Sequence, residues 1–251
     1  MRYYGCPAEE GGAAKTYMAR DGLFDDVSAA ISWHPSTFNA VQHGHSLANS
    51  RIDYTFTGKA AHAAAAPQLG RSALDACELM NIGVNYMREH MPDSARVHYA
   101  YLDVGGAAPN VVQAKATVRQ LVRAEDLSTL RDLVGRVNKI AEGAALMTGT
   151  TVESSIYSGV SNLVGNLPLE KVMQQEFEKL GPVQFDQNDA VFANEIRGTL
   201  TEDDIAASFQ RIGFETPESL ALCDFVAPLE RVGEGGEGSS EVGEYIERGV
   251  G

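Results

Sequence analysis

The sequence is short of cysteine, of positive charge and of long apolar runs. Its 251 residues include three cysteines and carry a net charge of -14. Three widely spaced cysteines do not suggest a disulfide framework, and they favour reduced thiols in a cytoplasmic protein. The deficit of Lys and Arg argues against a nucleic-acid partner. Without 18 consecutive apolar residues or a signal-like N-terminus, the sequence predicts neither a membrane span nor secretion.

Apolar residues nevertheless make up 44% of the chain, enough for the core of one large domain or two modest ones. Residues 52–56 alternate apolar and polar side chains, as in a strand with one buried face. Strand-like runs also lie near residues 97–101, 116–122 and 152–157. Between the strands, two stretches repeat apolar residues at helical spacing: Ala73, Cys77, Met80, Val84 and Met87, then Leu127, Leu130, Val134, Val137, Ala141 and Ala144. Residues 51–158 therefore predict a ferredoxin-like βαββαβ unit with helices on one face of its sheet.

This unit is predicted to be inserted in an α/β domain formed by residues 1–50 and 159–251, because insertion at a surface loop is well tolerated. In the first part, a short helix near residues 13–22 precedes a buried strand over residues 27–33, which delivers His34 at its carboxyl end. Ligands commonly bind at such ends in open α/β sheets. In the second part, a helix is predicted from Leu169 to Leu180, and Thr201 is predicted to cap another.

Two adjacent carboxylates, Glu9 and Glu10, are the first candidates for chemistry. At a strand end their side chains diverge, so one can bind a metal while the other faces a water. The alternative is a pair of solvated glutamates in a polar turn. His34 is likewise either a metal ligand or a capped surface residue. His43 and His45 are interpreted as loop residues, because their two-residue spacing in a glycine turn lacks a third ligand.

These candidates belong to a larger set of motifs in a fixed order. They lie at residues 4–12, 30–35, 46–49, 58–64, 70–76, 95–100, 109–113 and 141–148. Together they resemble the dinuclear-metal amidohydrolase and metallopeptidase family of carboxypeptidases, aminoacylases and hippurate hydrolases. The resemblance implies a catalytic α/β domain with an inserted dimerisation or lid domain. It also implies hydrolysis of an amide next to a free carboxylate, as in N-acyl amino acids or p-aminobenzoyl-glutamate.

The resemblance further implies a cofactor of two divalent ions, manganese or zinc, with Glu10 and His34 as ligands and Glu9 as general base. His62 would reach across a dimer to polarise the scissile carbonyl in the partner's site. Asn110 would assist it, and Arg123 would lie near the substrate. The alternatives from the residues alone are a helix-start or turn residue for His62, a turn residue for Asn110 and a solvated strand end for Arg123.

The partner implied is a second copy or a related subunit. Binding of single-stranded RNA to the βαββαβ sheet is disfavoured, because the chain is acidic and lacks a basic and aromatic signature. Compared with the five protein ligands of the family, the chain supplies Glu10 and His34, and its residues 238–244 depart from a family motif. The sequence is therefore expected to be truncated at both ends. A truncated or non-catalytic subunit that acts as a dimerisation or interaction module is the alternative function.

Overall fold

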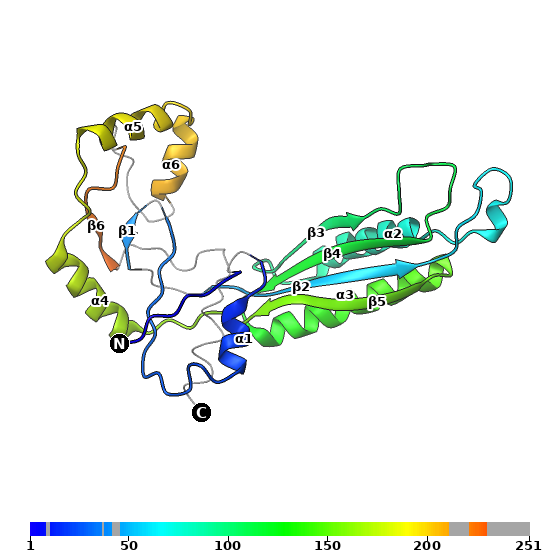
Figure 1. The fold of residues 1–251 in the computed structure, drawn as a ribbon, viewed down its shortest axis with the longest axis horizontal. Helices are drawn as coiled ribbons and strands as arrows, with labels where there is room; N and C mark the ends of the chain where they lie inside the picture. Colours follow the sequence, from blue (N-terminus) through cyan, green and yellow to red (C-terminus); the bar gives the residue numbers. More distant parts are fainter. Residues whose placement is uncertain (9–10, 37, 42–45, 211–220, 230–251) are drawn as a thin grey trace. The chain divides into compact units, whose positions relative to one another are not determined.

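The computed structural model describes residues 1–8, 11–36, 38–41, 46–210 and 221–229 (Figure 1). The chain forms two units. The first contains residues 1–28 and 46–163, and the second contains residues 29–45 and 164–238, as far as these are described. Among the described helices, none is long and apolar enough to cross a membrane.

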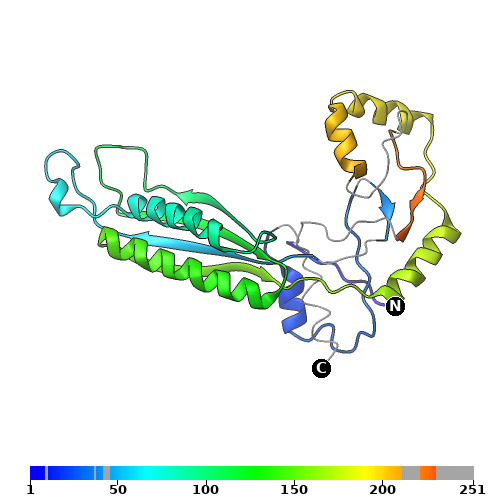
Figure 2. The ribbon, with the colours of Figure 1, turned by 180° about the vertical axis from the view of Figure 1, so that it is seen from behind.

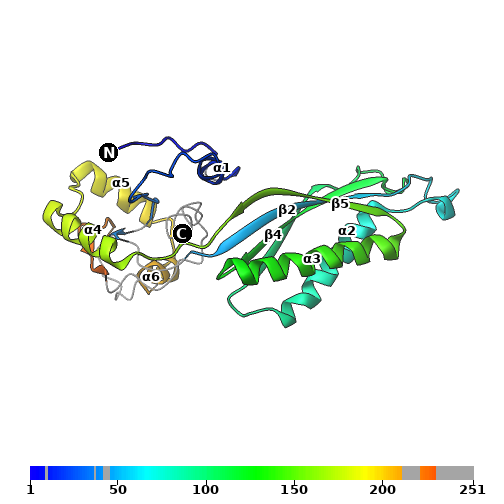
Figure 3. The ribbon, with the colours of Figure 1, turned by 90° about the horizontal axis from the view of Figure 1, so that it is seen from below.

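A four-stranded antiparallel sheet dominates the first unit, in the order β3-β4-β2-β5. The strands are β2 (Ala48–Thr57), β3 (Arg96–Asp103), β4 (Lys115–Ala124) and β5 (Thr151–Val160). Helix α2 (Ala73–Met87) follows β2, and α3 (Leu127–Thr148) follows β4. Both helices lie on the same side of the strands (Figure 3). The predicted βαββαβ unit is therefore confirmed.

The core lies between the sheet and the two helices, which Figure 2 shows in front of the strands. The inward side chains of β2 are Ile52, Tyr54 and Phe56, all buried as their alternation predicts. The predicted stripe of α2 is buried throughout, and that of α3 is buried except for the partly exposed Leu127 and Val134. Burial raises the pKa of the Cys77 thiol to about 12. Cys77 is thus a packing residue rather than a nucleophile.

Hydrogen bonds from the buried side chains Gln120, Asn81 and Tyr54 fix both helices on the sheet. Gln120 of β4 donates to Asn81 of α2 at 2.8 Å, and Asn81 donates to the Tyr101 hydroxyl of β3 at 3.1 Å. The Tyr54 hydroxyl donates to Asn138 of α3 at 2.6 Å. Because these bonds satisfy buried polar atoms only in one alignment, they set the register between helices and strands.

Local sequence determines where both helices begin. The Ser72 hydroxyl accepts from the backbone N–H of Asp75 at 3.0 Å, which caps α2. Asp126 accepts from the N–H of Thr129 at 2.8 Å and caps α3, and this bond lowers the pKa of its carboxyl. Gly149 ends α3 with φ +66°, a conformation that favours glycine.

The described part of the first unit also contains three shorter helices: α1 (Ala14–Arg20), η1 (Pro67–Leu69) and η2 (Arg88–His90). The helix predicted near residues 13–22 is therefore confirmed. Hydrogen bonds tie this helix and the turn before it to the sheet: the Thr16 hydroxyl of α1 donates to the Gly159 carbonyl at 3.2 Å, and Arg51 of β2 donates to the Gly11 carbonyl at 3.3 Å.

The described residues of the second unit form three helices and one pair of short parallel strands. They are α4 (Leu167–Leu180), α5 (Gln187–Arg197), α6 (Glu202–Gln210), β1 (Asn39–Ala40) and β6 (Val226–Ala227). The helix predicted from Leu169 is confirmed. The predicted cap is confirmed as well, because the Thr201 hydroxyl accepts from the N–H of Asp204 at 3.2 Å and the Asp204 carboxylate accepts from the N–H of Thr201 at 3.1 Å.

The strand predicted over residues 27–33 is wrong. These residues form no regular secondary structure, and Trp33 at their end is 83% exposed. A strand is stabilised by hydrogen bonds to a neighbouring strand, and within the described residues none pairs with this segment. The apolar run alone was therefore insufficient to make the strand.

Candidate active site

Two loops at one end of the sheet form the tip that carries His62 and Asn110. The loop after β2 and the loop before β4 extend together beyond the strands, at the right of Figure 1. An antiparallel bridge joins His62 to Val111. On either side of it, the N–H of Ala63 donates to the Asn110 carbonyl at 2.9 Å, and the N–H of Val112 donates to the Ala61 carbonyl at 3.0 Å. The structure thus brings together two residues that the sequence assigned to one task.

Asn110 occupies a tight turn, as the preceding proline predicts. The N–H of Val111 donates to the Ala108 carbonyl at 3.1 Å, which places Pro109 and Asn110 at the two central positions. Proline favours the first of these positions because its ring fixes φ. The side chains of His62 and Asn110 are both exposed. They are available to a ligand or to another subunit.

The His62 ring has a defined orientation despite its exposure. Its Nδ1 atom accepts from the backbone N–H of Ala64 at 3.3 Å and from that of Ala65 at 3.2 Å. The N–H of Ala66 also donates to the His62 carbonyl at 2.9 Å, which closes the turn that presents those two amides. The ring is consequently held by its own backbone turn.

Arg123 lies at the opposite end of the sheet. It pairs with Asn49 and Arg96, whereas the tip follows the end where Lys115 pairs with Thr57. At about 3.4 Å per residue, Lys115 and Arg123 are roughly 27 Å apart along β4. Burial and the nearby Arg51 lower the pKa of Arg123. Within one chain, the structure therefore does not place Arg123 with His62 and Asn110.

The predicted metal-site residues are only partly described. Glu9 and Glu10 lie outside the described residues, as do His43 and His45. His34 belongs to the second unit and is exposed, with Nδ1 at 2.8 Å from the Pro35 carbonyl. In the part of the chain that the structure describes, no three His, Cys, Asp or Glu side chains are grouped so that they could hold a metal.

Sequence reasoning missed a cluster on the face of the sheet opposite the helices. Arg119 donates two hydrogen bonds to Asp53, at 2.6 and 2.8 Å, and its guanidinium lies 3.8 Å from the centre of the Tyr157 ring. The Asp53 carboxylate raises the pKa of Arg119. Alternation alone put Asp53 on the polar face, but the pairing of β2 with β4 and β5 was needed to bring the three side chains together.

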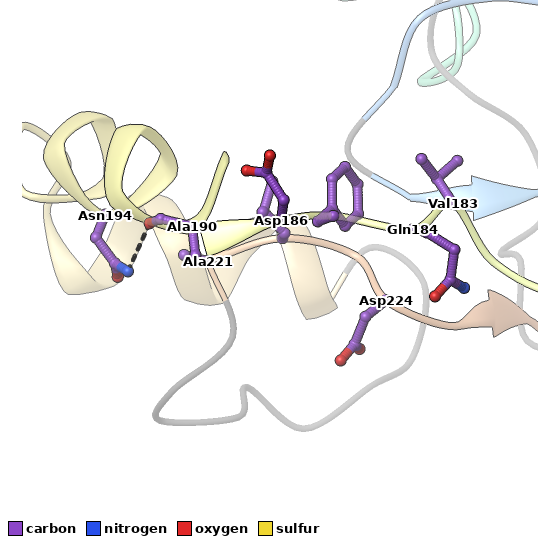
Figure 4. Close-up of a pocket in the computed structure, with 9 residues that line it drawn as sticks. Val183, Gln184, Asp186, Ala190, Asn194, Ala221 and Asp224 are labelled. Atoms are coloured by element: carbon purple, nitrogen blue, oxygen red, sulfur yellow. Dashed lines mark hydrogen bonds between the residues drawn. The ribbon is translucent and has the colours of Figure 1, made fainter. Parts of the chain in front are cut away.

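A cavity of about 470 Å³ lies in the second unit (Figure 4). Its lining includes Phe185, Asp186, Asn194 and Asp224. The Asp186 carboxylate already accepts from two N–H groups of α5, at 2.7 and 2.9 Å, as a helix cap. No predicted site residue lines this cavity, and we assign it no role.

Known proteins supply the context for the tip. Residues 46–147 match the family described as the peptidase dimerisation domain, M20_dimer. The chain carries an M20 dimerisation domain. It is 46% identical to a p-aminobenzoyl-glutamate hydrolase subunit of Escherichia coli K12, over 88% of this chain and 47% of that protein. It is 32% identical to the Xaa-Arg dipeptidase of Mus musculus, over 74% of this chain and 43% of that protein.

The fold is similar to the crystal structure of an aminobenzoyl-glutamate utilization protein from Klebsiella pneumoniae. The TM-score is 0.60 at 20% identity, over 96% of this chain and 52% of that one. The M20 dimerisation domain and these relatives confirm the resemblance to the metallopeptidase-type amidohydrolases. The chain spans about half the length of the curated relatives it matches.

Proposed function

We propose that the protein carrying this chain is a metal-dependent amidohydrolase that cleaves an amide bond next to a free carboxylate. Its substrate would be p-aminobenzoyl-glutamate or a related N-acyl amino acid. The proposal is supported by the 46% identity to a relative named for hydrolysis of p-aminobenzoyl-glutamate. The structural observation that carries it is the tip, where backbone hydrogen bonds join the loop of His62 to the loop of Asn110 and both side chains are exposed.

His34 fits the role of a metal ligand. Since a carbonyl oxygen only accepts hydrogen bonds, the 2.8 Å contact with Pro35 makes Nδ1 the donor and leaves the lone pair on Nε2. A metal-bound histidine commonly donates its other N–H in this way. Glu10 and His34 would hold two divalent ions, manganese or zinc, together with ligands from the rest of the protein. When bound, such ions supply Lewis acidity that polarises the scissile carbonyl and activates a water.

The side chains of this chain would move the proton and orient the substrate. Glu9 would take a proton from the attacking water and return it to the nitrogen of the leaving amine. His62, assisted by Asn110, would donate a hydrogen bond to the carbonyl oxygen as negative charge develops there. Arg123 would bind the free carboxylate of the substrate, because a guanidinium matches that group with two parallel donors.

A second copy of the chain, or a related subunit, would complete the site. Arg123 lies at one end of β4 and the tip follows the other end, roughly 27 Å away along the strand, so one small substrate cannot contact both His62 and Arg123 of the same chain. If both act on one substrate, they come from different subunits. Exposed Ile82 and Tyr86 of α2 and exposed Tyr99 of β3 provide apolar surface for such a contact. No described strand pairs with the outer edge of β3, which is open to a further strand.

The alternative is a subunit or interaction module without catalytic activity of its own. The match to the dimerisation domain over residues 46–147 favours it, since that family is described by assembly rather than by chemistry. A module would dimerise but would neither bind divalent metal through Glu10 nor hydrolyse amides. Metal content and turnover therefore separate the two functions.

Substitution of each glutamate in the protein carrying this sequence tests the proposal. Glu9→Gln should keep its metal content and lose turnover of p-aminobenzoyl-glutamate by about 100-fold or more, as expected for loss of a general base. Glu10→Gln should lose both metal and turnover. Metal content is measured by elemental analysis of the purified proteins. Equal metal loss in both variants would refute the division of roles, and absence of hydrolysis in the unmodified protein would favour the module.

A further inference from the structure

The hydrogen bonds of the His62 ring determine which of its nitrogens carries the proton. Two backbone N–H groups, those of Ala64 and Ala65, point at Nδ1 from 3.3 and 3.2 Å. Both are donors, so Nδ1 must offer its lone pair to them. In a neutral imidazole the other nitrogen, Nε2, then carries the hydrogen. Within the described residues, Nε2 has no hydrogen-bond partner, and the side chain is exposed.

We propose that the amides of Ala64 and Ala65 are positioning groups that lock His62 as the Nε2–H tautomer and aim this N–H outward. This inference rests on the proposed function and specifies what His62 contributes to it. The ligand that fits is an acceptor such as the carbonyl oxygen of an amide. A locked Nε2–H excludes Nε2 as a metal ligand or as the general base in that state, because both roles require its lone pair.

The surrounding backbone makes this arrangement rigid. The residue after His62 donates to the Asn110 carbonyl at 2.9 Å, and the residue before it accepts from Val112 at 3.0 Å. The turn that presents the two amides is closed by the bond from Ala66 to the His62 carbonyl. Short alanine side chains follow His62 from residue 63 to 66, so the neighbouring side chains do not cover the ring. A fixed donor costs little reorganisation when charge develops on the carbonyl oxygen.

His34 provides a contrast within the same chain. Its Nδ1 faces the Pro35 carbonyl at 2.8 Å and therefore carries the hydrogen, which leaves the Nε2 lone pair. The two histidines thus present opposite groups at Nε2: His62 presents an N–H, and His34 presents a lone pair. The difference arises from the backbone groups that face each Nδ1.

Nitrogen NMR of the chain labelled at its histidines tests the tautomer directly. Spectra are recorded at about pH 8.5, above the usual range of histidine protonation. The His62 signals are assigned by their absence in His62→Gln. We expect His62 to show the Nε2–H form alone, whereas His90, which is exposed and has no ring hydrogen bond in the described structure, shows a mixture. An Nδ1–H form or a mixture at His62 like that of His90 would overturn the proposal. Neither outcome depends on hydrolysis, so the result is distinct from a failure of the proposed function.

Two substitutions separate the two sides of the ring. In His62→Asn the side-chain oxygen replaces Nδ1 as acceptor, whereas in His62→Gln the amide nitrogen replaces Nε2 as donor. We expect the Ala64 and Ala65 amides to exchange in the Asn variant at about the rate of the unmodified chain. In the Gln variant they should exchange faster, by about 10-fold or more. In the catalytic protein, His62→Gln should retain a higher kcat than His62→Asn, because only the Gln variant keeps a donor in place of Nε2. Equal exchange at the two amides in both variants would show that Nδ1 does not hold them.

Discussion

The two units differ in how completely they bury their apolar side chains. In the first unit, one cluster of buried residues from β2, β3, β4, α2 and α3 fills the space under the sheet. In the second, α5 has no buried residue among those described, and its Phe192 is 64% exposed. The first unit thus builds its fold from its own residues. The packed core of that unit therefore gives a defined position to the residues that it carries, such as His62.

The same difference explains the contrast between the two predicted site regions. His62 lies in a loop whose backbone is bonded on both sides to the loop of Asn110. His34 follows a segment without regular secondary structure, and its described contact is with the adjacent Pro35. Within the described residues, tertiary hydrogen bonds therefore hold the loop of the first predicted site residue, whereas a contact with the next residue orients the second.

The largest expected effect is the difference in stability cost between replacing a phenylalanine of the first unit and replacing one of the second. Phe56→Ala in β2 removes a side chain that is 0% exposed and should lower the stability of the first unit by about 3–5 kcal/mol. Phe192→Ala in α5 removes a largely exposed side chain and should change the stability of the second unit by no more than about 0.5 kcal/mol. Hydrogen exchange of the amides in β2 and α5 reports each unit separately. Similar losses in both would contradict the comparison.

A smaller effect is expected from the polar network of the first unit. Asn81→Ala leaves the buried amide of Gln120 without its acceptor and should cost about 1–3 kcal/mol. Asn85 on the same helix is exposed and accepts from the nearby Arg88, so Asn85→Ala is the matched control and should cost about 0.5 kcal/mol or less. The cost of each substitution is measured by urea unfolding, with hydrogen exchange of the β4 amides as the probe. Equal costs would mean that burial of the network contributes nothing.

The smallest expected effect is on stability and differs in sign between two glycines of α3, one at its end and one inside it. Gly149 has φ +66°, so Gly149→Ala should destabilise the first unit by about 1 kcal/mol. Gly143 lies inside α3 with open space where a Cβ would be, so Gly143→Ala should stabilise it by about 0.5–1 kcal/mol. Thermal unfolding of the two variants, followed by the circular dichroism of the chain, gives the direction of each shift. Shifts in the same direction would contradict this account of the end of α3.

Patterning predicted the fold of the first unit because local and tertiary preferences agree there. The stripe from Ala73 to Met87 has helical spacing, begins after the cap Ser72 and faces the core. The run over residues 27–33 shows the opposite case. Its apolar composition predicted a strand, but strand formation also requires a neighbour, and sequence pattern does not reveal whether one is present.

For the candidate site, the sequence identified His62 and Asn110 but not what holds them. The amides of Ala64 and Ala65 are backbone groups, and no residue type marks them as donors to Nδ1. The cluster of Asp53, Arg119 and Tyr157 depends on strand register, which is a tertiary property. The roles of all the predicted site residues stay predictions that rest on the family resemblance: Glu9, Glu10, His34, His62, Asn110 and Arg123.

We propose above that His62 serves the site of a neighbouring subunit. The decisive experiment mixes two inactive variants of the protein that carries this sequence, His62→Ala and Glu9→Gln. In a mixed dimer, one site would combine Glu9 of one chain with His62 of its partner, while the other site would lack both. By the symmetry of a two-fold interface, activity should return to at most about half per mixed dimer. No recovery, with subunit exchange confirmed by mass, would show that His62 acts within its own chain or has no catalytic role.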